Sequence, residues 1–372
     1  MDRPSKAGFS LRGRNTRNLI GVVTVTNRFK ADRRLDPRQA SILEAIDQVI
    51  SKFGDVDSRE EALAKVNSPE ELLKTESMKA MMEAFDEEAA VSSSGLVINR
   101  KTIVSAPDGN SVDMQFIRPD TDEILPCVFY IHGGGMAFTS CFDANYRAWG
   151  KLIAHQGLAV MMVDFRNCLS PSSSDEIAPF PAGLNDCVSG FLWTHDKAPD
   201  LGIDATHILV AGESGGGNLS IATTMQLIRD GHGEKQAGLY SLCPYINGTW
   251  PAEDLPSSID NEGIFITVGS NLIPMGYGIE QVESRNPVAW PSFATAEDVA
   301  AFPPTLISVN ECDPLRDEGV EFYRLLLSAG VKAHCRQVMG TMHAADLFIS
   351  AFPDLSRMTA RDIKAWVNEC RL

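Results

Sequence analysis

The sequence predicts an α/β protein with a mostly parallel β-sheet, helices on both faces of the sheet, and a helical cap. Three observations support this prediction. From about residue 95 onward, short apolar runs alternate with segments of helical periodicity. The runs are continuously apolar, as in strands that helices cover on both faces. Before residue 95 the pattern is helical only, so we expect an N-terminal arm with cap helices over 1–94 and the sheet domain over 95–372.

The composition is that of a globular protein. The 372 residues are 44% hydrophobic and 22% charged, with a mean hydropathy of −0.08. This apolar content is too high for a disordered chain, and no stretch approaches the roughly 20 apolar residues that span a bilayer. The net charge of −16 repels phosphate backbones and anionic lipids. It therefore excludes nucleic acid as an expected partner, and we expect no stable membrane insertion.

The N-terminal segment differs from the acidic remainder. Residues 1–31 contain seven basic residues and one acidic residue, a net charge of +6. This pattern fits either a mitochondrial transit peptide or an arm that folds over the acidic body. A secretory signal is disfavoured, because the apolar run from Leu19 to Val25 is short and is interrupted by Thr24. We favour the arm, as part of the cap, and a cytoplasmic location.

Cysteine and histidine spacing argues against metals. None of the eight cysteines forms a C-x-x-C pair, so neither a disulfide framework nor a zinc site is indicated. Buried free thiols in a reducing compartment are the simpler interpretation. The seven histidines lack any ligand spacing of the H-E-x-x-H kind. We therefore expect no metal and no organic cofactor.

Two helix starts are readable between residues 36 and 90. Asp36 precedes Pro37, and Gln39 gives the spacing of a capping box. Ser68 with Pro69 repeats the start signal. Behind it lies an apolar stripe that we interpret as a helix packing face, although such a stripe can also contact a ligand. Its members are Leu72, Leu73, Met78, Met81 and Met82.

Strands and helices then alternate. An edge hairpin or meander is expected from Val97-Ile98 and Ile103-Val104, followed by Val112 to Ile117, with Asp108-Gly109-Asn110 as its turn. The buried strands are expected at Cys127 to Ile131, Ala159 to Val163, Ile208 to Ala211 and Thr305 to Val309, followed by a strand-like stretch from His334 to Val338. Helices are expected near 145–156, 183–197, 216–229 and 318–329.

The alternation is interrupted once, between Pro244 and Pro304. These sixty or so residues are rich in Pro, Gly, Ser and Asn. A structureless loop of this length is uncommon in a compact domain. We expect an insertion over about 245–300 that folds with the N-terminal helices into the cap.

A G-x-S-x-G motif lies between a predicted strand and a predicted helix, at Gly212 to Gly216. Small residues at such a junction allow a sharp turn that exposes the oxygen of Ser214, and the amide of Gly215 then faces developing negative charge. A phosphate-binding loop is the competing interpretation. The missing G-K-[ST] signature and the acidic Glu213 argue against it.

A run of glycines follows the strand that ends at Ile131. It reads His132-Gly133-Gly134-Gly135. Successive glycines let backbone amides approach a small anion closely, as an oxyanion hole requires. A flexible turn is the alternative, but ligands of open α/β sheets bind at this end of the strands.

Two further motifs supply an acid and a base. Four carboxylates follow the strand that ends at Val309, and spacing does not choose among them, although Asp313 lies at the strand-to-turn transition. His343 follows the strand-like stretch that ends at Val338. A lone histidine is usually structural, but here the order is Ser, Asp, His, with separations of 99 and 30 residues. The four carboxylates are Glu311, Asp313, Asp317 and Glu318.

Together these motifs resemble the hormone-sensitive-lipase-like family of α/β-hydrolases, also called the family IV bacterial esterases, over roughly residues 95–372. Residues 163–167, 212–219 and 313–319 are most similar to the brefeldin A esterase type. The sequence departs from the family pattern at Glu213, where most relatives have Asp, and in Phe165-Arg166-Asn167, where D-Y-R is common.

The resemblance implies a role for each motif. Ser214 is the expected nucleophile, His343 the general base and acid, and Asp313 the acid that orients it. The oxyanion hole is expected from the amides of Gly134, Gly135 and Gly215, with Gly133 as the neighbouring alternative. His132 is expected to support the glycine loop.

The expected activity is hydrolysis of neutral, short- to medium-chain carboxylic esters through an acyl-enzyme. The partner is then a small ester, and both a monomer and a homodimer are compatible with the sequence. A lactonase and an acyltransferase use the same chemistry and stay open as alternatives. A receptor similar to the plant gibberellin receptors is the alternative from another class. It is disfavoured because those receptors have lost the histidine that His343 represents here.

Overall fold

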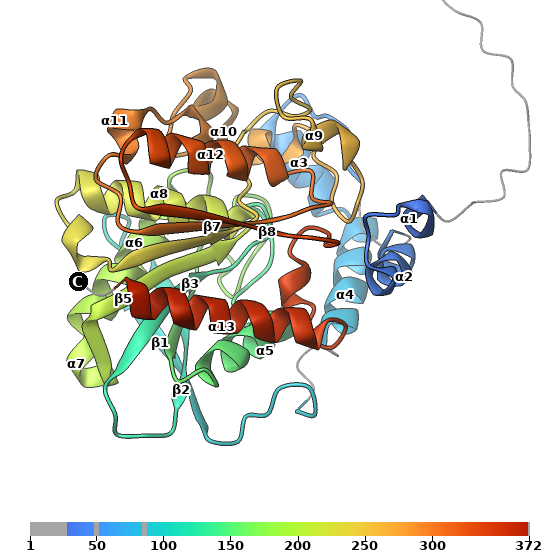
Figure 1. Cartoon of the computed structure of the whole chain (residues 1–372). Coiled ribbons are helices and arrows are strands. Elements are labelled where there is room, and N and C mark those ends of the chain that lie inside the picture. The colour runs from blue at the N-terminus through green and yellow to red at the C-terminus, as the bar shows by residue number, and fades with distance from the viewer. Residues whose placement is uncertain (1–27, 48–51, 84–87, 371–372) are drawn as a thin grey trace, which may run out of the picture.

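The computed structural model describes residues 28–47, 52–83 and 88–370, and its centre is an eight-stranded sheet (Figure 1). The strand order is β1-β2-β4-β3-β5-β6-β7-β8. β2 runs antiparallel to both its neighbours, and all pairs from β4 to β8 are parallel. The strands are β1 (Leu96–Val104), β2 (Ser111–Pro119), β3 (Leu125–Ile131), β4 (Ala159–Asp164), β5 (Ile203–Glu213), β6 (Gly238–Leu242), β7 (Thr305–Asn310) and β8 (Ala333–Val338).

Helices cover both faces of this sheet. One layer contains α6 (Ala182–Asp196), α8 (Gly215–Arg229) and α12 (Arg316–Ser328), and the other contains α5 (Ala144–Ala154) and α13 (Pro353–Glu369) (Figure 1). The remaining helices are α1 (Arg28–Ala31), α2 (Pro37–Ile46), α3 (Arg59–Val66), α4 (Pro69–Glu83), α7 (Ala198–Leu201), α9 (Ser257–Asp260), α10 (Leu272–Glu283) and α11 (Ala296–Val299), with short 3-10 turns at Gly233–Lys235, Pro291–Phe293 and Ala345–Leu347.

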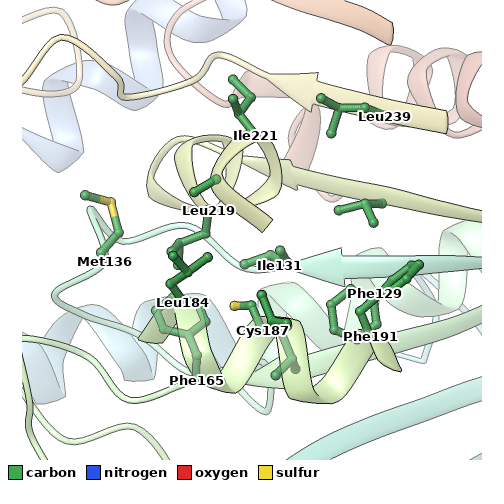
Figure 2. Close-up of a cluster of buried hydrophobic side chains, with 14 of the residues drawn as sticks. Phe129, Ile131, Met136, Phe165, Leu184, Cys187, Phe191, Leu219, Ile221 and Leu239 are labelled. Atoms are coloured by element: carbon green, nitrogen blue, oxygen red, sulfur yellow. The ribbon is translucent and has the colours of Figure 1, made fainter. Parts of the chain in front are cut away.

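The continuous apolar runs of the central strands have a direct structural cause. Successive side chains of a strand point to opposite faces, so both parities must be apolar when both faces are covered. Phe129 and Ile131 of β3 pack against α6 and α8, as Figure 2 shows. Val128 and Tyr130 of the same strand pack against α5 and α13. The predicted sheet with helices on both faces is confirmed.

The N-terminal helices α1 to α4 gather at one end of the sheet (Figure 1). α3 packs against α10, and the two segments are joined by reciprocal bonds between Val56 and Asn271. Phe29 and Leu43 enter a separate apolar cluster with Phe352, near the start of α13. These contacts support a cap built from both segments, and the division at residue 94 stays a prediction. The expected arm falls mainly on residues 1–27, which lie outside the described residues.

Several local predictions need correction. The strand β6 and the helix α13 were not predicted. Gln39 does not complete a capping box: Asp36 caps α2 through the amide of Arg38, while Gln39 bonds a distant amide described below. The stripe on α4 is only partly a packing face. Met78 and Met81 pack against the α1–α2 cluster, but Leu72 and Leu73 are 45% and 65% exposed.

The predicted buried thiols are observed among the described residues. All eight cysteines are free thiols, and all except the half-buried Cys335 are buried. Among helices in the described part of the chain, none combines the length and apolar character that crossing a membrane requires.

Candidate active site

The G-x-S-x-G motif forms a sharp turn between β5 and α8. Ser214 adopts φ 57° and ψ −120°, a positive φ that side chains other than glycine rarely adopt. Its amide donates to the carbonyl of Leu242 at the end of β6, at 3.0 Å. Backbone strain of this kind concentrates at functional sites, where the surrounding structure holds it in place. The turn places Ser214 at the carboxyl edge of the sheet, at the start of α8.

The glycine loop after β3 lies directly against this turn. A Cβ on Gly215 would be 2.6 Å from the amide nitrogen of Gly135, so only glycine permits the approach. Gly134 has φ +89°, and a Cβ there would lie 2.3 Å from the carbonyl oxygen of Phe138. Among the described residues, no acceptor is bonded to the amides of Gly134 and Gly135. The structure therefore places Gly215 directly against the Gly135 end of the glycine loop, and Gly134 precedes Gly135 in the same loop.

The amide of Gly133 is already bonded. It donates to Glu213 Oε1 at 2.7 Å and lies 2.9 Å from the hydroxyl of Tyr146. It is therefore committed to holding the loop, which separates it from its neighbours Gly134 and Gly135.

Glu213 is the centre of a buried polar network beneath the glycine loop. Besides Gly133, it accepts the hydroxyl of Tyr146 at 2.6 Å and that of Tyr130 at 2.5 Å. Burial raises the pKa of Glu213 to about 7, although the three donors favour its ionised form. Glu213 therefore ties the turn that carries Ser214 to the glycine loop.

His132 supports the same loop from the other side. Its Nδ1 donates to the carbonyl of Gly133 at 3.0 Å, and its ring stacks on Phe165 with centroids 4.2 Å apart. Burial lowers the pKa of His132, which favours a neutral ring. Phe165 thus supplies the stacking partner of His132. The following Arg166 fixes that segment through a buried bond to Asp186 at 2.8 Å.

Asp313 and His343 form a buried pair. Nδ1 of His343 lies 2.7 Å from Oδ2 of Asp313, and the other carboxylate oxygen accepts the amide of Leu315 at 2.8 Å. Burial is the largest single effect on His343 and opposes its protonation. The charge and hydrogen bond of Asp313, together with the contact of Cys243, outweigh burial and raise the pKa of the imidazole well above its usual value. Of the four carboxylates that the sequence left open, Asp313 is the one that bonds the histidine.

The other three carboxylates have separate partners. Glu311 accepts the amide of Gly340 at 2.7 Å, and Asp317 accepts the amide of Ser257 at 2.7 Å. Glu318 is buried and accepts from Ile246 and Trp250. All three shape the loops around the site without reaching the imidazole.

Cys243 connects the nucleophile turn with the acid–base pair. It follows Leu242, the acceptor of the Ser214 amide, and its sulfur lies within 4.8 Å of ligand atoms of both Asp313 and His343. Sulfur, nitrogen and oxygen are the donors that zinc prefers. Here the imidazole and the carboxylate are already bonded to each other, and burial raises the pKa of the Cys243 thiol. The contacts within this group account for its arrangement without an ion.

Two residues of the segment between β6 and β7 approach the site. A Cβ on Gly135 would lie 2.7 Å from Cδ1 of Ile273, so α10 covers the glycine loop. The ring of Phe265 lies 6.4 Å from that of His343, at 28° between the planes, and Phe265 has φ +69°. Sequence analysis missed these residues, together with Tyr130, Tyr146 and Cys243, because each reaches the site through a contact between segments distant in sequence.

Comparison with known proteins agrees with this geometry. Residues 128–347 match a family with the α/β hydrolase fold. Brefeldin A esterase, a bacterial homologue of human hormone-sensitive lipase, is 32% identical, with a TM-score of 0.79 over 92% of this chain and 95% of that enzyme. The chain belongs to the hormone-sensitive-lipase-like family of α/β-hydrolases.

Two further proteins extend the comparison. Esterase Est22 is 53% identical, with a TM-score of 0.87 over 92% of this chain and 99% of Est22. Carboxylesterase NlhH of Mycobacterium tuberculosis is 30% identical over 251 residues, which are 66% of this chain and 75% of NlhH. Like these two esterases, the chain is a carboxylic ester hydrolase.

Proposed function

We propose that the protein is a serine carboxylesterase in which Ser214, His343 and Asp313 form the catalytic triad. The observation that carries the proposal is the buried bond between His343 and Asp313, beside a nucleophile turn that faces free glycine amides. An imidazole oriented by a carboxylate is the arrangement that activates a serine hydroxyl.

The mechanism follows from these positions. His343 takes the proton of Ser214 as the serine oxygen attacks the ester carbonyl. The amides of Gly134, Gly135 and Gly215 stabilise the tetrahedral oxyanion, and losing one such donor typically costs about 3–4 kcal/mol of barrier. His343 then protonates the leaving alcohol, and water hydrolyses the acyl-enzyme by the same steps. Apart from the ester and the hydrolytic water, the groups named in these steps come from the chain itself.

We infer neutral esters of short to medium acyl length as substrates. The net charge of −16 disfavours anionic substrates. The aromatic ring of Phe265 and the aliphatic Ile273 border the site, and both favour an apolar substrate. Est22 has been crystallised with p-nitrophenol, the product that p-nitrophenyl esters release, which supports these esters as assay substrates.

A lactonase is the second candidate, because brefeldin A esterase is similar over 92% of this chain. A cyclic ester would pass through the same acyl-enzyme, but its alcohol would stay attached to the acyl group. Comparing hydrolysis of an acyl-length series with hydrolysis of a few macrolactones distinguishes the two activities.

Replacing the nucleophile tests the main proposal. Ser214→Ala should abolish turnover of a short-chain p-nitrophenyl ester and labelling by a fluorophosphonate. Ser220→Ala is a matched control, because Ser220 is a buried serine of the same helix whose hydroxyl bonds only Gly217 among the contacts described. Undiminished turnover in Ser214→Ala would overturn the triad.

A further inference from the structure

Helix α2 of the N-terminal region contacts the loop that carries His343. Gln39 is 1% exposed, and its Oε1 accepts the amide of Met342 at 2.6 Å, across 303 residues of sequence. One turn earlier, the amide of Asp36 donates to the carbonyl of Gly340 at 2.9 Å. The two bonds fix the backbone immediately before the histidine.

The same loop is held on its other side by the turn that carries Asp313. Glu311 accepts the amide of Gly340, and the amide of Cys312 donates to the carbonyl of Thr341 at 2.9 Å. The backbone of residues 340–342 therefore lies between the acid's turn and α2. The orientation of the His343 side chain therefore depends on the bonds from α2 and on those from the turn that carries Asp313.

The N-terminal region also reaches the acid. Arg34 donates to Asn261 Oδ1 at 2.8 Å, and Asn261 donates from Nδ2 to the carbonyls of Asp313 and Glu311, at 3.0 and 3.2 Å. α2 itself is anchored by the buried Leu43, in the apolar cluster that includes Met342. The segment before the sheet domain is thus attached to both members of the acid–base pair.

A buried glutamine at this position requires a specific reason. Ordering its side chain costs conformational entropy, and its amide group loses hydration, so an apolar residue would suit a mere packing role. What Gln39 supplies is an acceptor for a buried backbone amide, which would otherwise be unpaired. Without that acceptor, the peptide before His343 would have to rotate to find another partner.

We propose that Gln39 is a positioning residue for the catalytic base, holding His343 in register with Asp313 and Ser214 through the amide of Met342. The inference rests on the triad proposed above. It gives the N-terminal segment a part in the chemical step in addition to any part in lining the substrate pocket. Misplacement of a reacting group by about 1 Å can cost on the order of 100-fold in rate.

The test uses the full-length protein with a short-chain p-nitrophenyl ester. Gln39→Met keeps the side-chain length and removes the acceptor, while Gln39→Asn keeps the amide but ends one methylene short. We expect kcat to fall roughly 10- to 100-fold in Gln39→Met and less in Gln39→Asn, with KM nearly unchanged. The acid limb of kcat/KM should move to lower pH in both, because a loosened contact with Asp313 lowers the pKa of His343.

A conservative substitution of Gln39 and a control variant distinguish a positioning role of Gln39 from a role in stability alone. Gln39→Glu restores an acceptor of the same length and should recover most of kcat. Ser41→Ala, on the exposed side of the same helix, should leave kcat and the pH profile unchanged. If Gln39→Met fails to fold, Gln39→Asn and Gln39→Glu provide the comparison. The proposal is overturned if the folded Gln39→Met or Gln39→Asn variant has the kcat and the pH profile of wild type. It is also overturned if these variants lose thermal stability and nothing else changes.

His343→Ala distinguishes this inference from the proposed function. If His343→Ala is inactive while the folded Gln39→Met and Gln39→Asn variants behave as wild type, the positioning role fails and the triad stands. If His343→Ala retains wild-type turnover, the triad fails as well.

Discussion

Tyr146 of α5 donates its hydroxyl hydrogen to Glu213, the residue before the proposed nucleophile Ser214, at 2.6 Å. The same carboxylate oxygen accepts the amide of Gly133. Through this contact, a helix on one face of the sheet, the nucleophile turn and the glycine loop are fixed relative to each other. The geometry of the proposed oxyanion hole therefore depends on groups that would not touch the substrate.

Removing the carboxylate should loosen the glycine loop. We expect Glu213→Ala to lower kcat on the order of 100-fold with little change in KM, because the loop amides act mainly in the transition state. Tyr146→Phe removes one donor and leaves Gly133 and Tyr130 bonded to Glu213, so its loss should be smaller. Steady-state kinetics of both variants make the comparison. Equal losses, or a change confined to KM, would contradict the assignment.

Asp313 should control both the rate and the pH dependence of the reaction. Asp313→Asn removes the charge that contributes most to raising the pKa of His343, while burial, which lowers that pKa, is unchanged. The acid limb of kcat/KM should therefore move to lower pH, and kcat should fall on the order of 10⁴-fold, by analogy with other serine hydrolase triads. The measurement is kcat/KM as a function of pH.

Asp317→Asn is the matched control for this prediction. Asp317 bonds Ser257 and Arg316, and its loss should leave the acid limb in place. A larger effect from Asp317 than from Asp313 would show that the wrong carboxylate had been assigned.

Local sequence patterns identified the parts of the site that lie within one strand–turn–helix unit. The sequence predicts Ser214 and Gly134 as site residues because steric limits near a sharp turn permit few residue types. Asp313 could not be separated from Asp317 and Glu318 by spacing. The choice depends on which carboxylate meets His343, a contact made between two loops 30 residues apart.

The same reason explains the other omissions. Gln39 has the spacing of a capping box, and only the folded chain shows that its partner is Met342 instead of the helix start. The strand β6 has five residues and begins with glycine, so it gives a weak local signal. Its position in the sheet is set by pairing with β5 and β7.

Phe265 should influence which alcohol groups the enzyme accepts. Its ring lies beside that of His343, which in the proposed mechanism protonates the leaving alcohol. Phe265→Ala should raise the relative kcat/KM of esters with bulky alcohols over methyl esters. Phe265→Gly should show the same preference and be more stable than Phe265→Ala by about 1 kcal/mol, because glycine tolerates φ +69°. An unchanged alcohol preference would exclude this role.

The N-terminal segment should affect selectivity through the same cap loop. Arg28 donates to the carbonyl of Gly263 at 2.6 Å, two residues before Phe265. Deleting residues 1–31 removes this bond and the buried Phe29, so the acyl-length profile should change. Deleting residues 1–27 retains Arg28 and tests the basic arm separately. An acyl-length profile that stays constant in the longer deletion would count against a cap role.

Glu318 should make the stability of the enzyme depend on pH. It is buried and accepts the amides of Ile246 and Asn247 and the indole of Trp250, and burial raises its pKa to about 8. Because the folded protein binds this proton more tightly than the unfolded chain, the stabilisation is fully present below the ordinary pKa of 4.5. It is lost as pH rises toward 8, by at most about 1.4 kcal/mol per pH unit.

The amide in Glu318→Gln does not titrate, so this component should disappear from the variant. As pH rises from 5 to 8, wild type loses this stabilisation and Glu318→Gln does not. The free energy of unfolding of Glu318→Gln should therefore increase relative to that of wild type over this range. Urea unfolding at four pH values in this range measures the difference.

Asp317→Asn is again the control. The pKa of Asp317 is lowered in the folded protein, so its difference from wild type should stay constant above pH 5. Parallel curves for wild type and Glu318→Gln would mean that Glu318 does not titrate in this range.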